Sequence, residues 1–213
     1  MNDTRKSLVA AAGVATVLAA VLVIVTGCAG SGKATVAPQT VAGTQQVCAS
    51  CHGSDGWGVS PTFPRLAGQQ ADYLVAQLKA FRDKTRADPH AHTYMWGMAA
   101  KLTDETIDGL AASYAAMPAS PGTPGDPAEM AAGAKIYADG IAARDVPACV
   151  GCHGDKAEGA STIPRLASQR RGYIERQLAA FASNSRANEI MHDNSKSLTP
   201  EEITQVAAFV AAQ

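Results

Sequence analysis

The sequence Cys-Ala-Ser-Cys-His at residues 48–52 constrains this chain most, because it recurs 101 residues later as Cys-Val-Gly-Cys-His at residues 149–153. Two cysteines separated by two residues and followed directly by histidine form the attachment pattern of c-type haem. Each thiol adds to one vinyl group of the haem, and the histidine is held beneath the iron as an axial ligand. The sequence therefore predicts two covalent haem c groups. Their thioether residues would be Cys48, Cys51, Cys149 and Cys152, and their axial histidines His52 and His153.

Other uses of a Cys-x-x-Cys pair fit this chain less well. A structural zinc site needs two such pairs about 15–20 residues apart, or a cysteine pair with a regularly spaced histidine pair. A redox disulfide of the thioredoxin type stands in a βαβ context, whereas the flanking sequence here is rich in alanine and helical in pattern. Zinc and a redox disulfide are the alternatives to haem.

The two halves of the chain are copies of each other. Residues 63–69 (Phe-Pro-Arg-Leu-Ala-Gly-Gln) match residues 163–169 (Ile-Pro-Arg-Leu-Ala-Ser-Gln). The match continues at the same offset through Tyr73/Tyr173, Gln77/Gln177, Leu78/Leu178, Phe81/Phe181 and Arg86/Arg186. Because both copies keep the cysteine and histidine pattern, the repeat indicates two similar haem domains in tandem.

Helical signals dominate both copies. Tyr73, Leu74, Leu78 and Phe81 fall on one face of a helix and are expected to form core, as are their counterparts in the second copy. Residues 199–202 (Thr-Pro-Glu-Glu) form a capping box with proline at the first helical position. No strand pattern is comparably strong, so we expect an all-α fold with one covalently attached haem in each of two tandem helical domains.

Residues 1–28 are expected to target the chain rather than to join the fold. Arg5 and Lys6 precede an apolar run over residues 8–25, which ends in Val-Thr-Gly-Cys. This ending resembles the cleavage box of bacterial lipoprotein signals, in which Cys28 would become the lipidated first residue. An uncleaved membrane-anchoring helix is the alternative. Either anchor would place the protein on the periplasmic side of a bacterial membrane, and we favour the lipid.

The rest of the chain divides at stretches of small residues and prolines. Each expected domain has roughly 80–90 residues, which is small for a hydrophobic core alone, so a bound haem would complete it. The expected segments are a flexible linker over 29–39, a first domain over 40–117, an interdomain linker over 118–126 and a second domain over 127–213.

The second axial ligand is expected at equivalent positions of the two copies. Met95 lies seven residues before Leu102, and Met191 lies seven residues before Leu198. Met98 and Met117 have no such counterpart, so Met95 and Met191 are predicted to bind the irons. The competing candidates, His92 and His192, are not equivalent to each other and are expected to be solvated loop histidines.

Four further residues are candidates to support the haems. Backbone carbonyls at Pro64 and Pro164 follow the two histidines by 12 and 11 residues and are placed to accept the ring N–H of each imidazole. Arg86 and Arg186 are candidates to pair with haem propionates.

Together these features resemble the diheme cytochrome c4 family of class I bacterial cytochromes c. The resemblance covers residues 40–213 and rests on the duplicated Cys-x-x-Cys-His, the Pro-Arg-Leu-Ala segment and the methionine before Leu-Thr. It implies two cytochrome c-like domains related by a pseudo-twofold axis, with His52 and Met95 on one iron and His153 and Met191 on the other. The short sequence before Cys48 departs from the pattern and puts the first domain's N-terminal helix in doubt.

The function expected from the resemblance and the ligand set is one-electron transfer. Redox proteins such as a quinol-oxidising complex and a terminal oxidase are the implied partners, without a small-molecule substrate. The 18 basic and 19 acidic residues are scattered, so we expect no nucleic-acid partner. The alternatives are a diheme oxidoreductase, such as a peroxidase or a dehydrogenase of small sulfur compounds, and the cytochrome subunit of a larger dehydrogenase or oxidase complex.

Overall fold

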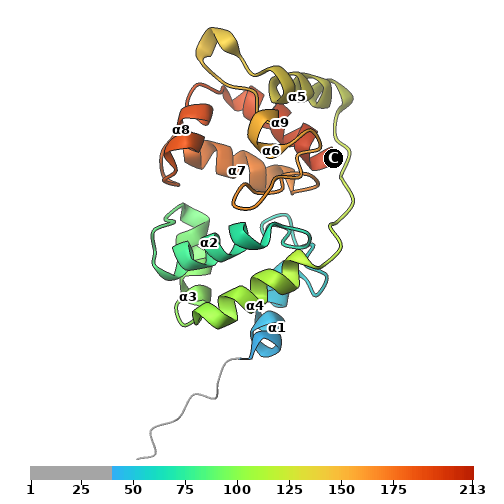
Figure 1. Ribbon diagram of the computed structural model, residues 1–213. Coiled ribbons are helices and arrows are strands. Elements are labelled where there is room, and N and C mark those ends of the chain that lie inside the picture. The colour runs from blue at the N-terminus through green and yellow to red at the C-terminus, as the bar shows by residue number, and fades with distance from the viewer. Residues whose placement is uncertain (1–39) are drawn as a thin grey trace, which may run out of the picture. The chain divides into compact units, whose positions relative to one another are not determined.

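The computed structural model describes residues 40–213, which are helical and contain no strand (Figure 1). The first half holds α1 (Val41–His52), α2 (Ala71–Arg82), a π-helical turn (Ala91–Met95), α3 (Trp96–Ala99) and α4 (Asp104–Ala115). The second half holds α5 (Pro127–Asp139), a 3-10 turn (Ala142–Arg144), α6 (Val150–His153), α7 (Arg171–Ala182), α8 (Glu189–Ser195) and α9 (Pro200–Ala212). The all-α prediction is therefore confirmed for this range.

The leading segment lies outside the described residues, so the predictions for residues 1–39, including Cys28, are not addressed by the structure. Within residues 40–213, no helix combines the length and the apolar character that a membrane crossing requires.

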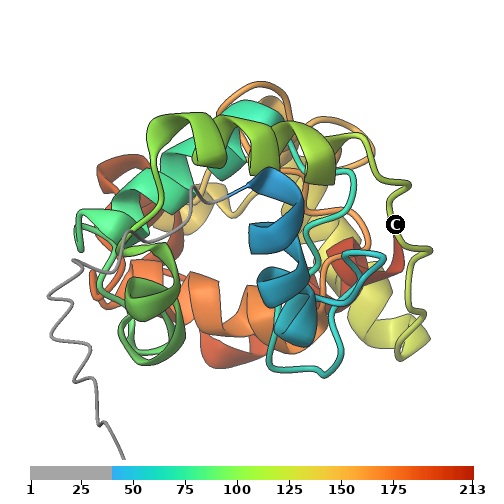
Figure 2. The ribbon, with the colours of Figure 1, turned by 90° about the horizontal axis from the view of Figure 1, so that it is seen from below.

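The first half packs α2 and α4 together, with α1 crossing α4 (Figure 2). Leu74 and Phe81 on α2 are buried against Ile107 and Leu110 on α4. The side chain of Thr103 accepts a hydrogen bond from the N–H of Thr106, which caps α4 at its start. Leu74 and Phe81 of the apolar face expected on α2 thus form core, with Leu78 packed against it, and a capped helix supports it.

The second half packs α5 along α9, and α7 and α8 complete it. Thr199 and Glu202 form the predicted capping box at the start of α9, with Pro200 as the first helical residue. The buried face of α9 carries several small residues, among them Ala207 and Ala211. Gly133 on α5 lies where the two helices approach closely, beside the backbone of Gln205.

The two N-terminal helices differ in their relation to the haem motif. The first domain has a complete helix despite its short lead, because α1 begins at the Thr40 cap and continues unbroken through His52. In the second domain α5 ends at Asp139, and the segment over 140–149 separates it from α6. This segment is held by a bridge between Ile141 and Val146 and by an ion pair between Arg144 and Glu202.

The two halves contact each other through reciprocal hydrogen bonds. The N–H of Arg65 donates to Oε1 of Gln169 at 2.9 Å, and the N–H of Arg165 donates to Oε1 of Gln69 at 2.7 Å. The Nε2 of each glutamine donates to the carbonyl of the same arginine, at 2.9 Å in both cases. Each half thus provides an arginine backbone and a glutamine side chain to the other, as expected for two halves related by an approximate two-fold axis.

The segment over 118–126 is fastened to both halves. The indole of Trp57 donates to the carbonyl of Pro118 at 3.1 Å, and Arg65 donates to the carbonyl of Pro121 at 3.3 Å. The N–H of Thr123 donates to the carbonyl of Ala211 at 2.7 Å. The connection between the halves is therefore held in place by specific hydrogen bonds along its length.

The close approach of α5 to α9 predicts a strong effect of Gly133→Ala. The added Cβ would meet the backbone of Gln205, so the helices must separate, and we expect the free energy of unfolding to fall by about 1–3 kcal/mol. Denaturant unfolding of the haem-loaded protein measures this change. Gly97→Ala in α3 is the matched control, because no other group lies within 4 Å of its added Cβ. Equal effects of the two substitutions would contradict the packing argument.

Candidate haem-binding sites

The two histidines of the repeated motif are buried and oriented in the same way. His52 ends α1 and is 6% exposed, and His153 ends α6 and is 8% exposed. The Nδ1 atom of His52 lies 2.9 Å from the carbonyl oxygen of Pro64, and Nδ1 of His153 lies 3.0 Å from that of Pro164. A carbonyl oxygen only accepts, so each Nδ1 carries the proton and each Nε2 keeps its lone pair.

The environment favours the neutral form of both imidazoles. Burial lowers the pKa of His52 and of His153, and the hydrogen bond to the proline carbonyl opposes this shift without cancelling it. A neutral imidazole with a free Nε2 is the form that binds a metal.

The four motif cysteines are unpaired, as covalent haem attachment requires. Cys48 packs against the core of the first half, and Cys149 against that of the second. Burial raises the pKa of the Cys48 thiol and raises that of Cys149 to about 11, which reflects the apolar surroundings that a haem ring needs. Beside Cys48, the hydroxyl of Tyr114 is buried, and burial raises the pKa of this hydroxyl.

The surroundings of the cysteine pairs do not favour a zinc site. Within residues 40–213, no three histidine, cysteine or acidic side chains are grouped closely enough to hold a metal ion. The cysteines also form no disulfide in this range. The residues present fit a ring attached through two thiols and held by one histidine.

The predicted methionine ligands are half-buried and lie in short helical segments. Met95 closes the π-helical turn and packs against the core of the first half. Met191 lies in the first turn of α8, and its N–H donates to the side chain of Asn188 at 2.8 Å. Met98, by contrast, is 58% exposed. The π-helical turn that Met95 closes is a local feature of the kind often found at functional sites.

The competing histidines have other contacts. His92 is exposed, with its ring edge against Trp96 at a centroid distance of 4.6 Å. His192 differs from the solvated loop histidine that we expected, because it lies in α8 and its Nδ1 lies 2.8 Å from the carbonyl of Phe181. This contact joins α8 to the end of α7, which is a structural role.

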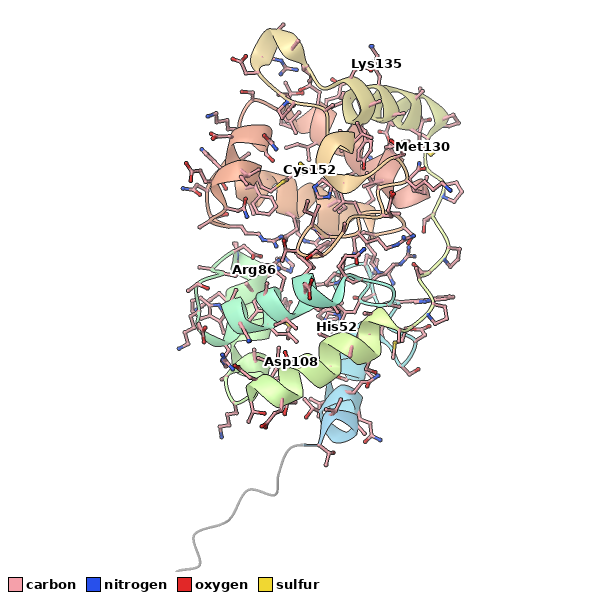
Figure 3. All side chains as sticks on the ribbon, viewed as in Figure 1. His52, Arg86, Asp108, Met130, Lys135 and Cys152 are labelled. Atoms are coloured by element: carbon pink, nitrogen blue, oxygen red, sulfur yellow. The ribbon has the colours of Figure 1, made fainter. Side chains whose placement is uncertain are left out.

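Arg86 and Arg186 lie where the two halves meet, and Figure 3 labels Arg86 there. Both are 7% exposed. Arg86 donates to Tyr173 at 3.3 Å and to Gln177 at 2.8 Å in the opposite half. Arg186 makes the mirror contacts, to Tyr73 at 3.0 Å and to Gln77 at 2.8 Å. The tyrosines expected in the core thus turn their hydroxyls to this interface.

Comparison with known proteins now identifies the family. The family model described as cytochrome c matches residues 39–112 and again residues 130–213. Cytochrome c-552 of Acidithiobacillus ferridurans is 38% identical over 167 residues, covering 78% of this chain and 73% of the relative. The solved cytochrome c4 of Acidithiobacillus ferrooxidans is 37% identical with a TM-score of 0.76, covering 79% of this chain and 99% of that one.

The chain belongs to the diheme cytochrome c4 family. It is an electron carrier, not an enzyme, and it holds two covalent haem c groups in two tandem cytochrome c domains. A further relative of this cytochrome is the thiosulfate dehydrogenase electron acceptor of Stutzerimonas stutzeri strain A1501. The two are 36% identical over 171 residues, covering 77% of each chain.

The cytochrome contains one buried acid at the interface that sequence reasoning missed. Asp88 is 2% exposed and accepts a hydrogen bond from Nε of Arg86 at 2.9 Å. Burial raises the pKa of Asp88, but the charge and hydrogen bond of Arg86, the charge of Arg186 and the N–H of Ala91 together hold the pKa of the carboxyl below its usual value. The matching residue of the second copy is Asn188, so the repeat itself signalled this difference between the domains.

Replacing the buried acid by Asp88→Asn is expected to destabilise the cytochrome by about 3 kcal/mol at neutral pH, because Arg86 keeps its buried charge without the carboxylate. The pKa of Asp88 is lowered on folding, so its contribution is present above the pKa of the unfolded chain and is lost as pH falls through the folded value. The variant should therefore lose less stability on acidification than the wild type.

Unfolding of the haem-loaded protein, followed by circular dichroism at several pH values, measures both effects. Asp83→Asn is the control, because Asp83 pairs with Arg82 at the surface and its loss should cost at most about 1 kcal/mol. A cost for Asp88→Asn no larger than this control would contradict the analysis.

Proposed function

We propose that this cytochrome carries single electrons between membrane-associated respiratory complexes on the periplasmic side. The observation that supports this most is the repetition of one arrangement: a buried histidine whose Nδ1 is bonded to a proline carbonyl, with a half-buried methionine in a following helix. When bound, each haem supplies an iron that cycles between the ferric and ferrous states. The chain supplies the ligands and excludes water.

The proposed axial pairs are His52 with Met95 and His153 with Met191. Thioether sulfur favours ferrous iron, so these pairs would set high potentials, suited to the oxidising end of a respiratory chain. Two filled axial positions would also leave no site for oxygen or peroxide. Pairing of Arg86 and Arg186 with haem propionates stays a prediction, because both guanidinium groups already have protein partners.

The proposed organisation follows the sequence boundaries. Residues 40–117 and 127–213 would form the two haem domains, joined by residues 118–126. Residues 29–39 would connect the first domain to a lipid on Cys28 or, alternatively, to a membrane-spanning helix. Such an anchor keeps the carrier close to membrane-bound donors and acceptors and raises its effective concentration there. A quinol-oxidising complex and a terminal oxidase are the proposed partners.

A second candidate donor is a dehydrogenase of small sulfur compounds. The likeness to the thiosulfate dehydrogenase electron acceptor of Stutzerimonas stutzeri supports it. In this version the cytochrome would accept electrons from the enzyme and leave the sulfur chemistry to it. Stopped-flow mixing distinguishes the two donors. The oxidised cytochrome is mixed with a quinol-oxidising complex plus quinol, or with thiosulfate dehydrogenase plus thiosulfate. The physiological donor is the enzyme that reduces the cytochrome within the time of one enzyme turnover.

The carrier function predicts two haems per chain, a sulfur-to-iron charge-transfer band in the oxidised protein and no binding of carbon monoxide by the reduced protein. Met95→Ala and Met191→Ala should each lower the potential of one haem, reduce the band and open that iron to carbon monoxide. An optical redox titration with haem quantification measures all of these quantities.

Met98→Ala is the matched control for these variants, because Met98 is exposed and three residues from Met95. It should leave both potentials and the band unchanged. Carbon monoxide binding by the wild type would instead favour a diheme oxidoreductase, and an unchanged titration for either ligand variant would refute that assignment.

The lipid anchor predicts that Cys28→Ser releases the protein from the membrane fraction, because the thiol that carries the lipid is gone. Fractionation of cells and the mass of the mature N-terminus measure the release. Ser31→Ala in the same segment should stay at the membrane. Retention of the Cys28→Ser protein would favour the uncleaved helix.

A further inference from the structure

The strongest unexplained feature is the peptide group that contains each proline carbonyl, because its N–H is bonded to the opposite domain. The carbonyl of Pro64, which accepts from Nδ1 of His52, belongs to the same peptide group as the N–H of Arg65. That N–H donates across the interface to Oε1 of Gln169 at 2.9 Å. One peptide group therefore joins the histidine of the first domain to a glutamine of the second.

The second domain repeats the connection in the opposite direction. The carbonyl of Pro164 accepts from Nδ1 of His153 at 3.0 Å, and the N–H of Arg165 in the same peptide group donates to Oε1 of Gln69 at 2.7 Å. We propose that Gln69 and Gln169 are positioning residues that tune the axial histidine, and hence the reduction potential, of the haem in the opposite domain.

The amide orientation that this proposal needs is determined by the backbone. Each glutamine Oε1 accepts the N–H of the opposite arginine and also the N–H of its own next residue, at 2.9 Å for both Gln70 and Arg170. Each Nε2 donates to a carbonyl, which only accepts. A flipped amide would place donors against donors, so the orientation has one solution.

The physical link is polarisation of the peptide group. The C–N bond of a peptide has partial double-bond character, which corresponds to a form with positive charge on nitrogen and negative charge on oxygen. An acceptor at the N–H and a donor at the C=O both stabilise this charge-separated form. A carbonyl whose own N–H is hydrogen-bonded thus accepts more strongly, and bonds in such chains reinforce one another by perhaps 10–30% each. The stronger acceptor makes the imidazole a more basic ligand.

Burial strengthens this series of hydrogen bonds between glutamine, peptide group and histidine. Gln69 and Gln169 are 7% and 6% exposed, and the two histidines are comparably buried. Water therefore neither screens these bonds nor replaces them readily. Since a more basic histidine stabilises ferric iron, each glutamine lowers the potential of the opposite haem. The two potentials then depend on the docking of the domains. This dependence rests on the proposed ligation of the irons by His52 and His153.

The test compares Gln69→Leu with Gln70→Leu. Leucine has a similar size and removes the amide, so Gln69→Leu should raise the potential of the His153 haem and leave that of the His52 haem nearly unchanged. Gln70 also crosses the interface, donating to the carbonyl of Glu158 at 2.9 Å, but it has no link to a histidine ring. Gln70→Leu should therefore shift neither potential by a comparable amount.

The mirror variant Gln169→Leu should raise the potential of the His52 haem instead, which keeps the test valid if one variant does not fold. The variants Met95→Ala and Met191→Ala assign each measured potential to its haem. A second readout is the proton signal of the histidine Nδ1–H in the reduced protein, which should move upfield in the domain opposite the substitution as its hydrogen bond weakens.

The outcomes separate this proposal from the proposed function. Fewer than two haems, or no methionine band in the wild type, would overturn the ligand assignment itself. Two haems with the band, but with equal shifts in Gln69→Leu and Gln70→Leu, would overturn the tuning role alone. So would a shift confined to the haem of the substituted domain, because the chain of hydrogen bonds predicts the crossed pattern.

Discussion

A buried imidazole that presents one nitrogen to a metal needs its other nitrogen held by the protein. In both domains the carbonyl of a proline does this, and it joins the haem-motif helix to the segment that leads into α2 or α7. The next residue of that segment forms the glutamine pairing between the halves. The orientation of each histidine and the docking of the two domains therefore depend on the same short Pro-Arg sequence.

The duplicated domains are not equivalent in charge or in local structure. Asp88 gives the first domain a buried carboxylate beside Arg86, whereas the second has the neutral Asn188. The segment from Arg86 to Met95 in the first domain, where the π-helical turn lies, is also longer than the matching segment from Arg186 to Met191 in the second. A buried charge and a different ligand segment are both means by which a protein distinguishes two haems of the same type.

Much of the fold followed from local patterns. The helix over Ala71–Arg82 and the capping box at Thr199 were predictable, because helical periodicity and capping act within a few residues. The first helix was in doubt, because only a short sequence precedes Cys48, yet α1 begins at the Thr40 cap, continues through His52 and packs against α4. His192 was expected in solvent, but its contact with Phe181 joins helices that only the fold brings together.

The sequence by itself determined the cofactor, its number and the class of fold, because covalent haem attachment requires a local motif that is visible in the chain and here appears twice. It also identified Pro64 and Pro164 as partners of the histidines. Only the tertiary structure decided that Gln69 and Gln169 complete those contacts from the opposite domain. Residues about 100 positions apart in the chain carry no local signal of pairing, and a hydrogen bond between them exists only once the domains have docked.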